Sequence, residues 1–173
     1  NLITSKGHPA FGGVYKLAAI KNKEDEDFIP KIKLSENVEK VTNPGNKTIF
    51  RIYDKATGKI RADLICLADE VFDPEKDMII FDPMATWKKT KIEGGTYTLR
   101  ELLVPIFKKG ECVYTSPSVM EIRDICQKEK QTLWGETLRL VNPQEVYVDL
   151  SDKLYKIKSD LLEEMSQAAI KNE

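Results

Sequence analysis

The sequence predicts an α+β fold, in which short β-strands and a hairpin are followed by C-terminal helices. Strand-like patterns, with β-branched, aromatic and alternating apolar residues, fill the first half of the chain. Apolar residues at helical spacing fill the second half, so the two kinds of element are separated rather than interleaved. The chain has 173 residues, enough to bury roughly 70% of the surface of its unfolded form in a core.

Two extended segments come first. Residues 14–20 have the β-branched and aromatic content of a strand. Residues 29–34 alternate apolar and basic side chains, and Pro30 is typical of an edge strand or a strand start because it has no N–H to donate. The charge run at residues 21–27 between them predicts a solvated loop.

The clearest hairpin joins residues 48–53 to residues 60–67. Residues 54–59 connect them and contain the Asp and Gly that a tight turn needs. Residues 78–81 predict a short buried strand. The basic run at residues 88–91 could be a nucleic-acid patch, but in a neutral chain it is more typical of the solvent face of a strand.

Three helices are predicted after these strands. The first begins at Thr98, which forms a capping-box pattern with Glu101, and ends near Gly110. The second opens at residues 116–118, with Pro117 at the first helical position. The third is capped by Ser151 and carries one apolar stripe, which predicts either a core face or a docking face. The stripe consists of Leu154, Ile157, Leu161, Leu162, Met165 and Ala168.

Composition excludes some classes of partner. The chain has 27 Lys and Arg against 28 Asp and Glu, so it lacks the basic excess of a nucleic-acid-binding protein. No apolar run approaches the roughly 20 residues that span a bilayer. We therefore expect neither nucleic acid nor membrane as a partner. Cys66, Cys112 and Cys126 show no metal-type spacing, and we expect Cys66 and Cys126 to be small core residues in a protein of the reducing cytoplasm.

The residues alone carry no catalytic signature. His8 is the only histidine, and the sequence contains no nucleophile elbow, dinucleotide fingerprint, P-loop or metal-ligand cluster. Thr4, Ser5 and nearby glycines could bring backbone N–H groups to a phosphate, which is a weak signal by itself. Because residue 1 is Asn rather than Met, we expect either a removed leader or a longer parent polypeptide.

Six segments of the chain resemble a single enzyme family. They are residues 2–5 (LITS), 9–17 (PAFGGVYKL), 30–36 (PKIKLSE), 39–45 (EKVTNPG), 50–53 (FRIY) and, more weakly, 147–151 (YVDLS). These segments resemble the nicotinate phosphoribosyltransferases, which are type II phosphoribosyltransferases, over nearly the whole chain. The resemblance implies an enzyme that joins nicotinate to phosphoribosyl pyrophosphate and gives nicotinate mononucleotide for NAD biosynthesis. It also implies coupling to ATP through a phosphorylated histidine, with Mg²⁺ at the pyrophosphate.

The resemblance also implies a division of the chain and a set of site residues. Residues 1–24 would be the end of the catalytic β/α barrel, and residues 25–173 a C-terminal α+β domain. The residues that would border the phosphoribosyl pyrophosphate site are Asn1, Thr4 and Ser5. A motif for packing against the barrel would consist of Gly12, Gly13, Tyr15 and Lys16. His8 does not correspond to the phosphorylated histidine, so we expect no catalytic residue and no metal ligand in this chain, with ATP and Mg²⁺ bound by the full-length enzyme.

On this interpretation the protein is a cytoplasmic homodimer, and the 173-residue chain alone is inactive, with mobile residues 1–10. The alternative is a stand-alone α+β interaction module without catalysis, which docks a partner through its last helix. An upstream coding region with a glycine-rich loop would favour the enzyme, and a start codon at residue 1 would favour the module.

Overall fold

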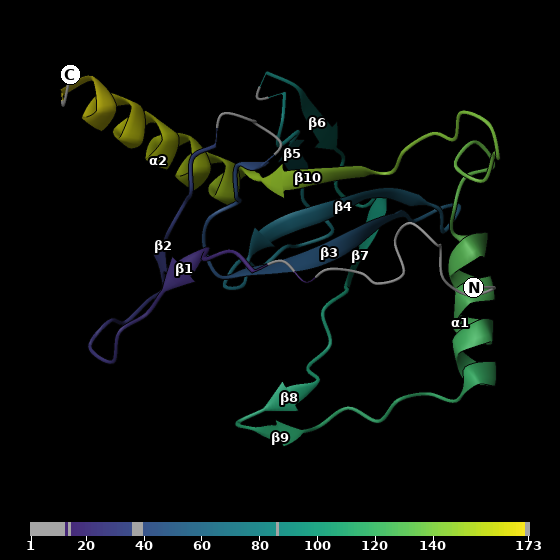
Figure 1. Ribbon diagram of the computed structural model, residues 1–173. Helices are drawn as coiled ribbons and strands as arrows, with labels where there is room; N and C mark the ends of the chain where they lie inside the picture. The colour runs from purple at the N-terminus through teal and green to yellow at the C-terminus, as the bar shows by residue number, and fades with distance from the viewer. Residues whose placement is uncertain (1–12, 14, 36–39, 86, 172–173) are drawn as a thin grey trace.

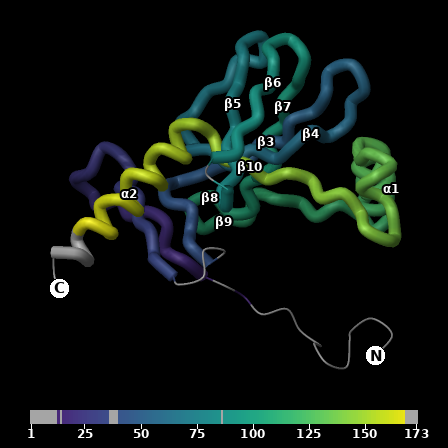
Figure 2. Tube along the Cα trace, turned by 90° about the horizontal axis from the view of Figure 1, so that it is seen from above, coloured from purple at the N-terminus to yellow at the C-terminus, as the bar shows by residue number. Residues whose placement is uncertain are grey.

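The computed structural model describes residues 13, 15–35, 40–85 and 87–171. Its centre is a six-stranded sheet in the order β6-β5-β10-β4-β3-β7 (Figure 1). The strands of this sheet are β3 (Lys47–Asp54), β4 (Ile60–Leu67), β5 (Met78–Phe81), β6 (Lys89–Ile92), β7 (Tyr97–Glu101) and β10 (Tyr147–Ser151). Helices α1 (Val119–Gln131) and α2 (Asp152–Lys171) lie at opposite ends of the sheet (Figures 1 and 2). The predicted α+β class is confirmed.

The predicted hairpin is confirmed as β3 and β4. The two strands pair antiparallel, with Arg51 opposite Asp63. The Arg51 side chain donates to both carboxylate oxygens of Asp63, at 2.7 and 2.8 Å. In the connecting turn the Asp54 carboxylate accepts the Thr57 N–H at 2.8 Å, and Gly58 has a φ of 67° that favours glycine. Local sequence therefore determines this part of the sheet.

Strand β10 completes the sheet, although it lies far along the chain from its neighbours. It runs parallel to β4, with Asp149 paired to Leu64, and antiparallel to β5, with Leu150 paired to Phe81. Alternation along β10 places Tyr147 and Asp149 on one face of the sheet and Leu150 on the other. The sequence pattern of residues 147–151 did not predict this strand.

Each face of the sheet carries a hydrophobic cluster. The larger cluster consists of Ile52, Ala62, Leu64, Cys66, Met78, Ile80, Ile92 and Tyr97. On the other face Leu67 and Leu150 pack against Leu154 of α2. The Ser151 hydroxyl accepts the Leu154 N–H at 3.2 Å, so the predicted cap of the last helix is confirmed.

Helix α2 is also tied to the sheet by a buried lysine. Lys158 is 8% exposed, and its Nζ donates to Asn43 Oδ1 at 2.9 Å and to the Pro83 carbonyl oxygen at 3.3 Å. Burial lowers the pKa of the Lys158 ammonium. Lys158 therefore packs against the sheet, although lysine is rarely buried in folded proteins.

The predicted helix over residues 98–110 is wrong. Tyr97–Glu101 forms β7 and pairs antiparallel with β3. Tyr97 is buried in the larger cluster, and its hydroxyl lies 3.0 Å from the Lys76 carbonyl oxygen. Glu101 accepts a hydrogen bond from the Thr48 hydroxyl at 2.6 Å and does not cap a helix. Strand pairing thus overrides the capping-box pattern, and beyond it the chain forms the small hairpin β8 (Phe107–Lys108) and β9 (Glu111–Cys112).

Other predicted boundaries also change. The strands expected over residues 14–20 and 29–34 shrink to β1 (Ala19–Ile20) and β2 (Ile29–Pro30), which pair only with each other among the described residues. The second helix begins at Val119 and not at Pro117 as predicted, because Ser118 is its N-cap and forms a capping box with Glu121. Cys126 on this helix is exposed, whereas Cys66 is buried as predicted.

Candidate functional site

The site residues suggested by the family resemblance fall at the start of the chain. Asn1, Thr4, Ser5, Gly12 and also His8 lie outside the described residues, so their roles stay predictions. Tyr15 is 91% exposed, and no described atom lies within 4 Å of a Cβ built on Gly13. Lys16 Nζ donates to the Lys40 carbonyl oxygen at 3.3 Å. Within this chain the described members of the packing motif contact little, and their packing against a barrel stays a prediction.

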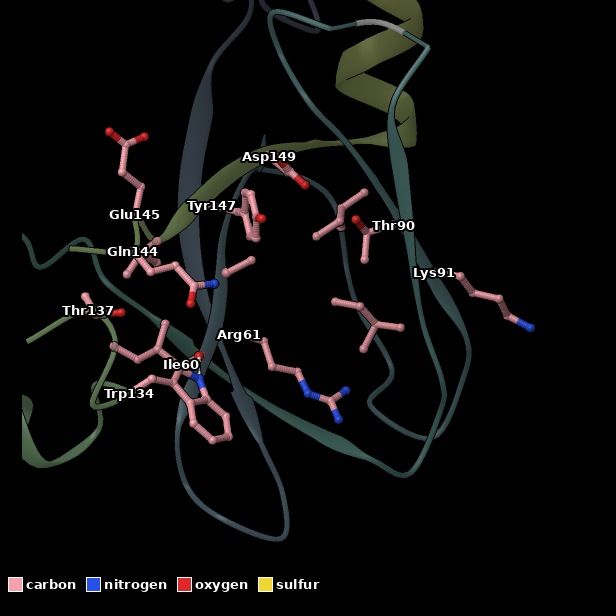
Figure 3. Close-up of a pocket in the computed structure, with 14 residues that line it drawn as sticks. Ile60, Arg61, Thr90, Lys91, Trp134, Thr137, Gln144, Glu145, Tyr147 and Asp149 are labelled. Carbon is pink, nitrogen blue, oxygen red and sulfur yellow. Dashed lines mark hydrogen bonds between the residues drawn. The ribbon is translucent and has the colours of Figure 1, made fainter. Parts of the chain in front are cut away.

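A pocket lies at the end of the sheet where β4 and β10 begin (Figure 3). Its volume is about 340 Å³. The floor is aliphatic and comes from β4, β5 and β6, through Ile60, Ala62, Ile80 and Ile92. The segment that follows α1, residues 134–146, forms the opposite side. The pocket therefore joins elements that are distant in the sequence.

Two aromatic side chains form walls of this pocket. The Trp134 indole N–H donates to the Ile60 carbonyl oxygen at 2.6 Å, which fixes the ring against the start of β4. The Tyr147 ring lies beside the pocket at the start of β10, and Lys88 Nζ is 4.9 Å from its centroid. Both rings are partly exposed, so their faces are accessible from the mouth of the pocket.

Asp149 gives the pocket an acidic group. Its side chain is 6% exposed and points into the pocket in Figure 3. Within the described part of the chain, its carboxylate makes no hydrogen bond and no ion pair. Burial raises the pKa of the Asp149 carboxyl, the negative charge of Asp82 raises it further, and Lys88 opposes this shift. A buried carboxylate without a partner is unfavourable, so this residue distinguishes the pocket from an ordinary surface hollow.

The cations that line the pocket are paired elsewhere. Arg61 donates to Asp54 at 2.6 Å and to the Thr96 hydroxyl at 3.1 Å. Lys91 lies 2.7 Å from Asp77, and Figure 3 shows its ammonium group pointing away from the pocket. Residues 147–151 showed only a weak family resemblance, which did not indicate a site. A lone acid inside an apolar segment was the signal that could have indicated Asp149.

Two further findings bear on ligands and membranes. In the described ranges, no group of three or more His, Cys, Asp or Glu side chains is arranged to hold a metal ion. The described residues thus offer no ready-made ligand cluster for the Mg²⁺ that the family implies, and no chemical step in this chain is assigned to it. Among the described helices, none is both long enough and apolar enough to span a membrane.

Comparison with known proteins first defines the class. Residues 46–158, which include the whole six-stranded sheet and α1, match the family model described as "Nicotinate phosphoribosyltransferase C-terminal domain". The solved crystal structure of human nicotinic acid phosphoribosyltransferase matches with a TM-score of 0.59, 24% identity and coverage of 70% of this chain and 24% of that one. This match supports the fold.

Sequence relatives then define the family. The chain is 34% identical over 174 residues to nicotinate phosphoribosyltransferase of Bacillus subtilis (strain 168), covering 96% of the chain and 35% of the relative. It is 32% identical over 158 residues to nicotinate phosphoribosyltransferase of Caenorhabditis elegans, covering 90% and 26%. The chain belongs to the nicotinate phosphoribosyltransferase family, as its C-terminal domain, and spans about a third or less of the length of these relatives.

Proposed function

We propose that this chain is the C-terminal domain of an enzyme that joins nicotinate to phosphoribosyl pyrophosphate. The product is nicotinate mononucleotide for NAD biosynthesis, and the reaction is coupled to ATP and uses Mg²⁺ bound by the remainder of the polypeptide. We further propose a cytoplasmic homodimer. The observation that carries the proposal is the 34% identity to a nicotinate phosphoribosyltransferase across 96% of the chain.

In this proposal the chain alone has no transferase activity. The residues that would border the phosphoribosyl pyrophosphate, Asn1, Thr4 and Ser5, are few, and the family's phosphorylated histidine has no counterpart here. Among the described residues, no group of three or more His, Cys, Asp or Glu side chains is arranged to hold a metal ion. We propose that the domain contributes to the enzyme by supporting its catalytic part.

The exposed apolar residues at the hairpin β8–β9 are consistent with this structural role. The hairpin β8–β9 projects away from the six-stranded sheet, on the side opposite α2 in Figure 1. Exposed apolar side chains occur in this hairpin and next to it in the sequence, namely Leu103, Val104, Ile106, Phe107 and Val113. Contiguous exposed apolar side chains typically mark an interface. Because the relatives extend far beyond the matched region, we propose that this hairpin packs on the rest of the same polypeptide.

The activity is tested by measuring nicotinate mononucleotide formation from nicotinate and phosphoribosyl pyrophosphate, with and without ATP and Mg²⁺. The full polypeptide should form product, with a rate that rises on adding ATP, and the 173-residue chain should form none. Turnover by the chain alone would refute its supporting role. An inactive full polypeptide would refute the proposed enzyme and favour the interaction module.

The hairpin interface is tested by Phe107→Ser, with Lys108→Ser as the matched control on the same strand. Phe107 is 69% exposed in this chain. Phe107→Ser should therefore leave the melting temperature of the 173-residue chain unchanged while lowering that of the full polypeptide. Lys108→Ser should change neither. Equal effects of both substitutions on the full polypeptide would contradict the proposed packing.

A further inference from the structure

We propose that the pocket between Trp134, Tyr147 and Asp149 binds a small molecule that carries a protonated nitrogen on a flat apolar body. Asp149 is the recognition carboxylate, and the two aromatic rings with the aliphatic floor hold the body. This inference does not depend on the transferase activity, because it rests on the pocket alone.

The Asp149 carboxylate lacks a partner among the described residues. Asp149 as a residue is 6% exposed and no described residue donates a hydrogen bond to its carboxylate, so this group has lost part of its hydration and gains no protein hydrogen bond in return. Native proteins satisfy buried polar groups, so an exception needs an explanation. A ligand that donates hydrogen bonds and carries positive charge satisfies this group, because charge-assisted hydrogen bonds are the strong ones.

The protein's own cations do not serve as this partner. Arg61 is held by Asp54, and Lys91 by Asp77. Lys88 lies 3.5 Å from Asp82, its Nζ is 4.9 Å from the centroid of the Tyr147 ring, and it does not line the pocket. The remaining charged group of the lining, Glu145, is an acid and is exposed. The pocket is therefore built with an acid inside and its nearby cations engaged elsewhere.

The shape of the pocket defines the rest of the ligand. Its volume of about 340 Å³ suits a small molecule and is too small for a dinucleotide. The wall at Trp134 is fixed by the hydrogen bond to the Ile60 carbonyl oxygen, so its ring is a preformed surface. Aromatic faces also attract cations, which adds to the preference for a positively charged ligand. Aryl amidines and arylalkyl amines, which are protonated at neutral pH, have these properties.

The experiment uses benzamidinium as the probe and benzamide as its neutral analogue of nearly the same shape. Binding to the full polypeptide is measured by calorimetry without nicotinate or phosphoribosyl pyrophosphate. Benzamidinium should bind saturably, and benzamide should bind at least about tenfold more weakly, because a hydrogen bond to a charged group is lost. Trp134 should report the binding through its fluorescence.

Two variants assign the effect to Asp149. Asp149→Asn should weaken benzamidinium at least about tenfold, because the buried charge that pairs with the ligand is removed. Glu145→Gln removes one negative charge at the rim, where the carboxylate points away from the pocket in Figure 3, and should leave binding within about twofold because exposed charges are screened. Asp149→Asn should still fold, and a thermal melt verifies this.

The stability of Asp149→Asn relative to the wild type should also change with pH in a defined direction. The pKa of Asp149 is raised in the folded state, so the folded protein prefers the protonated form. The wild type therefore loses stability as pH rises through the unfolded pKa, which is about 3.9, up to the folded value. Asp149→Asn should accordingly melt at or above the wild-type temperature at neutral pH, and this advantage should vanish below about pH 3.9. The charges of Asp82 and Lys88 act on Asp149 in opposite directions, and Arg61, Lys91 and Glu145 are the other charged side chains that line the pocket.

The proposal is overturned by any of three results. Equal binding of benzamide and benzamidinium would show that the carboxylate does not select the ligand. Unchanged binding by Asp149→Asn would place the probe elsewhere. Binding by the 173-residue chain that is absent in the full polypeptide would show that a basic side chain of the remaining polypeptide occupies the pocket.

Discussion

Glu129→Gln should loosen α1 from the sheet, because this helix has no buried residue to hold it. The Glu129 carboxylate accepts two hydrogen bonds from Arg100, at 2.7 and 2.9 Å, and lies 3.5 Å from Arg51. Arg100 belongs to β7 and Arg51 to β3, so one acid connects the helix to two strands. The C-terminal end of α1 has a separate anchor, since Lys59 Nζ donates to the Gln131 carbonyl oxygen at 2.7 Å.

The energy of the Arg100–Glu129 ion pair can be estimated from the exposure of the two side chains and from their geometry. The Arg100 and Glu129 side chains are 48% and 33% exposed, so solvent screens the pair. Screened pairs contribute about 0.2–1 kcal/mol, and bidentate geometry places this one near the upper end of that range. A loss of about 1 kcal/mol corresponds to roughly a fivefold change in the docking equilibrium.

Hydrogen exchange measures this docking directly. Amides in α1 that exchange when the helix undocks should lose about fivefold protection in Glu129→Gln, and Arg100→Met should give a similar loss. Combining the two substitutions should add little, because both remove the same interaction. Asp124→Asn, an exposed acid on the same helix, is the control and should change nothing.

Acid pH provides a second measurement of the same contact. Arg100 holds the pKa of the Glu129 carboxyl below its usual range. Its contribution is therefore complete above the unfolded value, about 4.3, and is lost as pH falls through the lower folded value. Unchanged exchange of α1 in Glu129→Gln, at neutral and at acid pH, would refute this account of how the helix is held.

Two further substitutions or reagents test the fold elsewhere. Gly94→Ala should lower the unfolding free energy by about 1–3 kcal/mol in a urea titration, because its Cβ would lie 2.3 Å from the Glu75 carbonyl oxygen. Gly135→Ala is the control and should lower it far less, because no atom lies within 4 Å of the added Cβ. Iodoacetamide should alkylate Cys126 in the folded protein and spare Cys66, whose burial raises the pKa of its thiol to about 12. Mass spectrometry of peptides shows which cysteine is alkylated. Rapid modification of Cys66 without denaturant would contradict its burial in the core.

The elements that sequence predicts correctly are those that local chemistry determines. The hairpin β3–β4 has alternating side chains and a turn whose Asp54 and Gly58 act within six residues of each other. Helix α2 has a cap at Ser151 and a continuous apolar stripe, and its start is as predicted. In both cases the decisive contacts lie close in sequence, so pattern and structure agree.

The wrong predictions fall where contacts between residues that are distant in the sequence determine the structure. Thr98 and Glu101 have capping-box spacing, but Tyr97 gains more by burial in the sheet, and β3 supplies an edge for pairing. Strand β10 carries Asp149 in its middle, which weakens its apolar pattern, and its partners are far away in the chain. The pocket was missed for the same reason, because it forms only when β4, β10 and the segment after α1 come together.

The insertion of β10 between β4 and β5 has a consequence for synthesis. A nascent chain that ends before Tyr147 holds two separate partial sheets, β3–β4–β7 and β5–β6, each with an unpaired inner edge. Such edges are templates for pairing with other chains. When β10 emerges from the ribosome it pairs with both edges at once, so the last strand made decides whether the partial sheets join each other or aggregate. Chaperone dependence of this domain should therefore concentrate in the interval between translation of β5 and translation of β10.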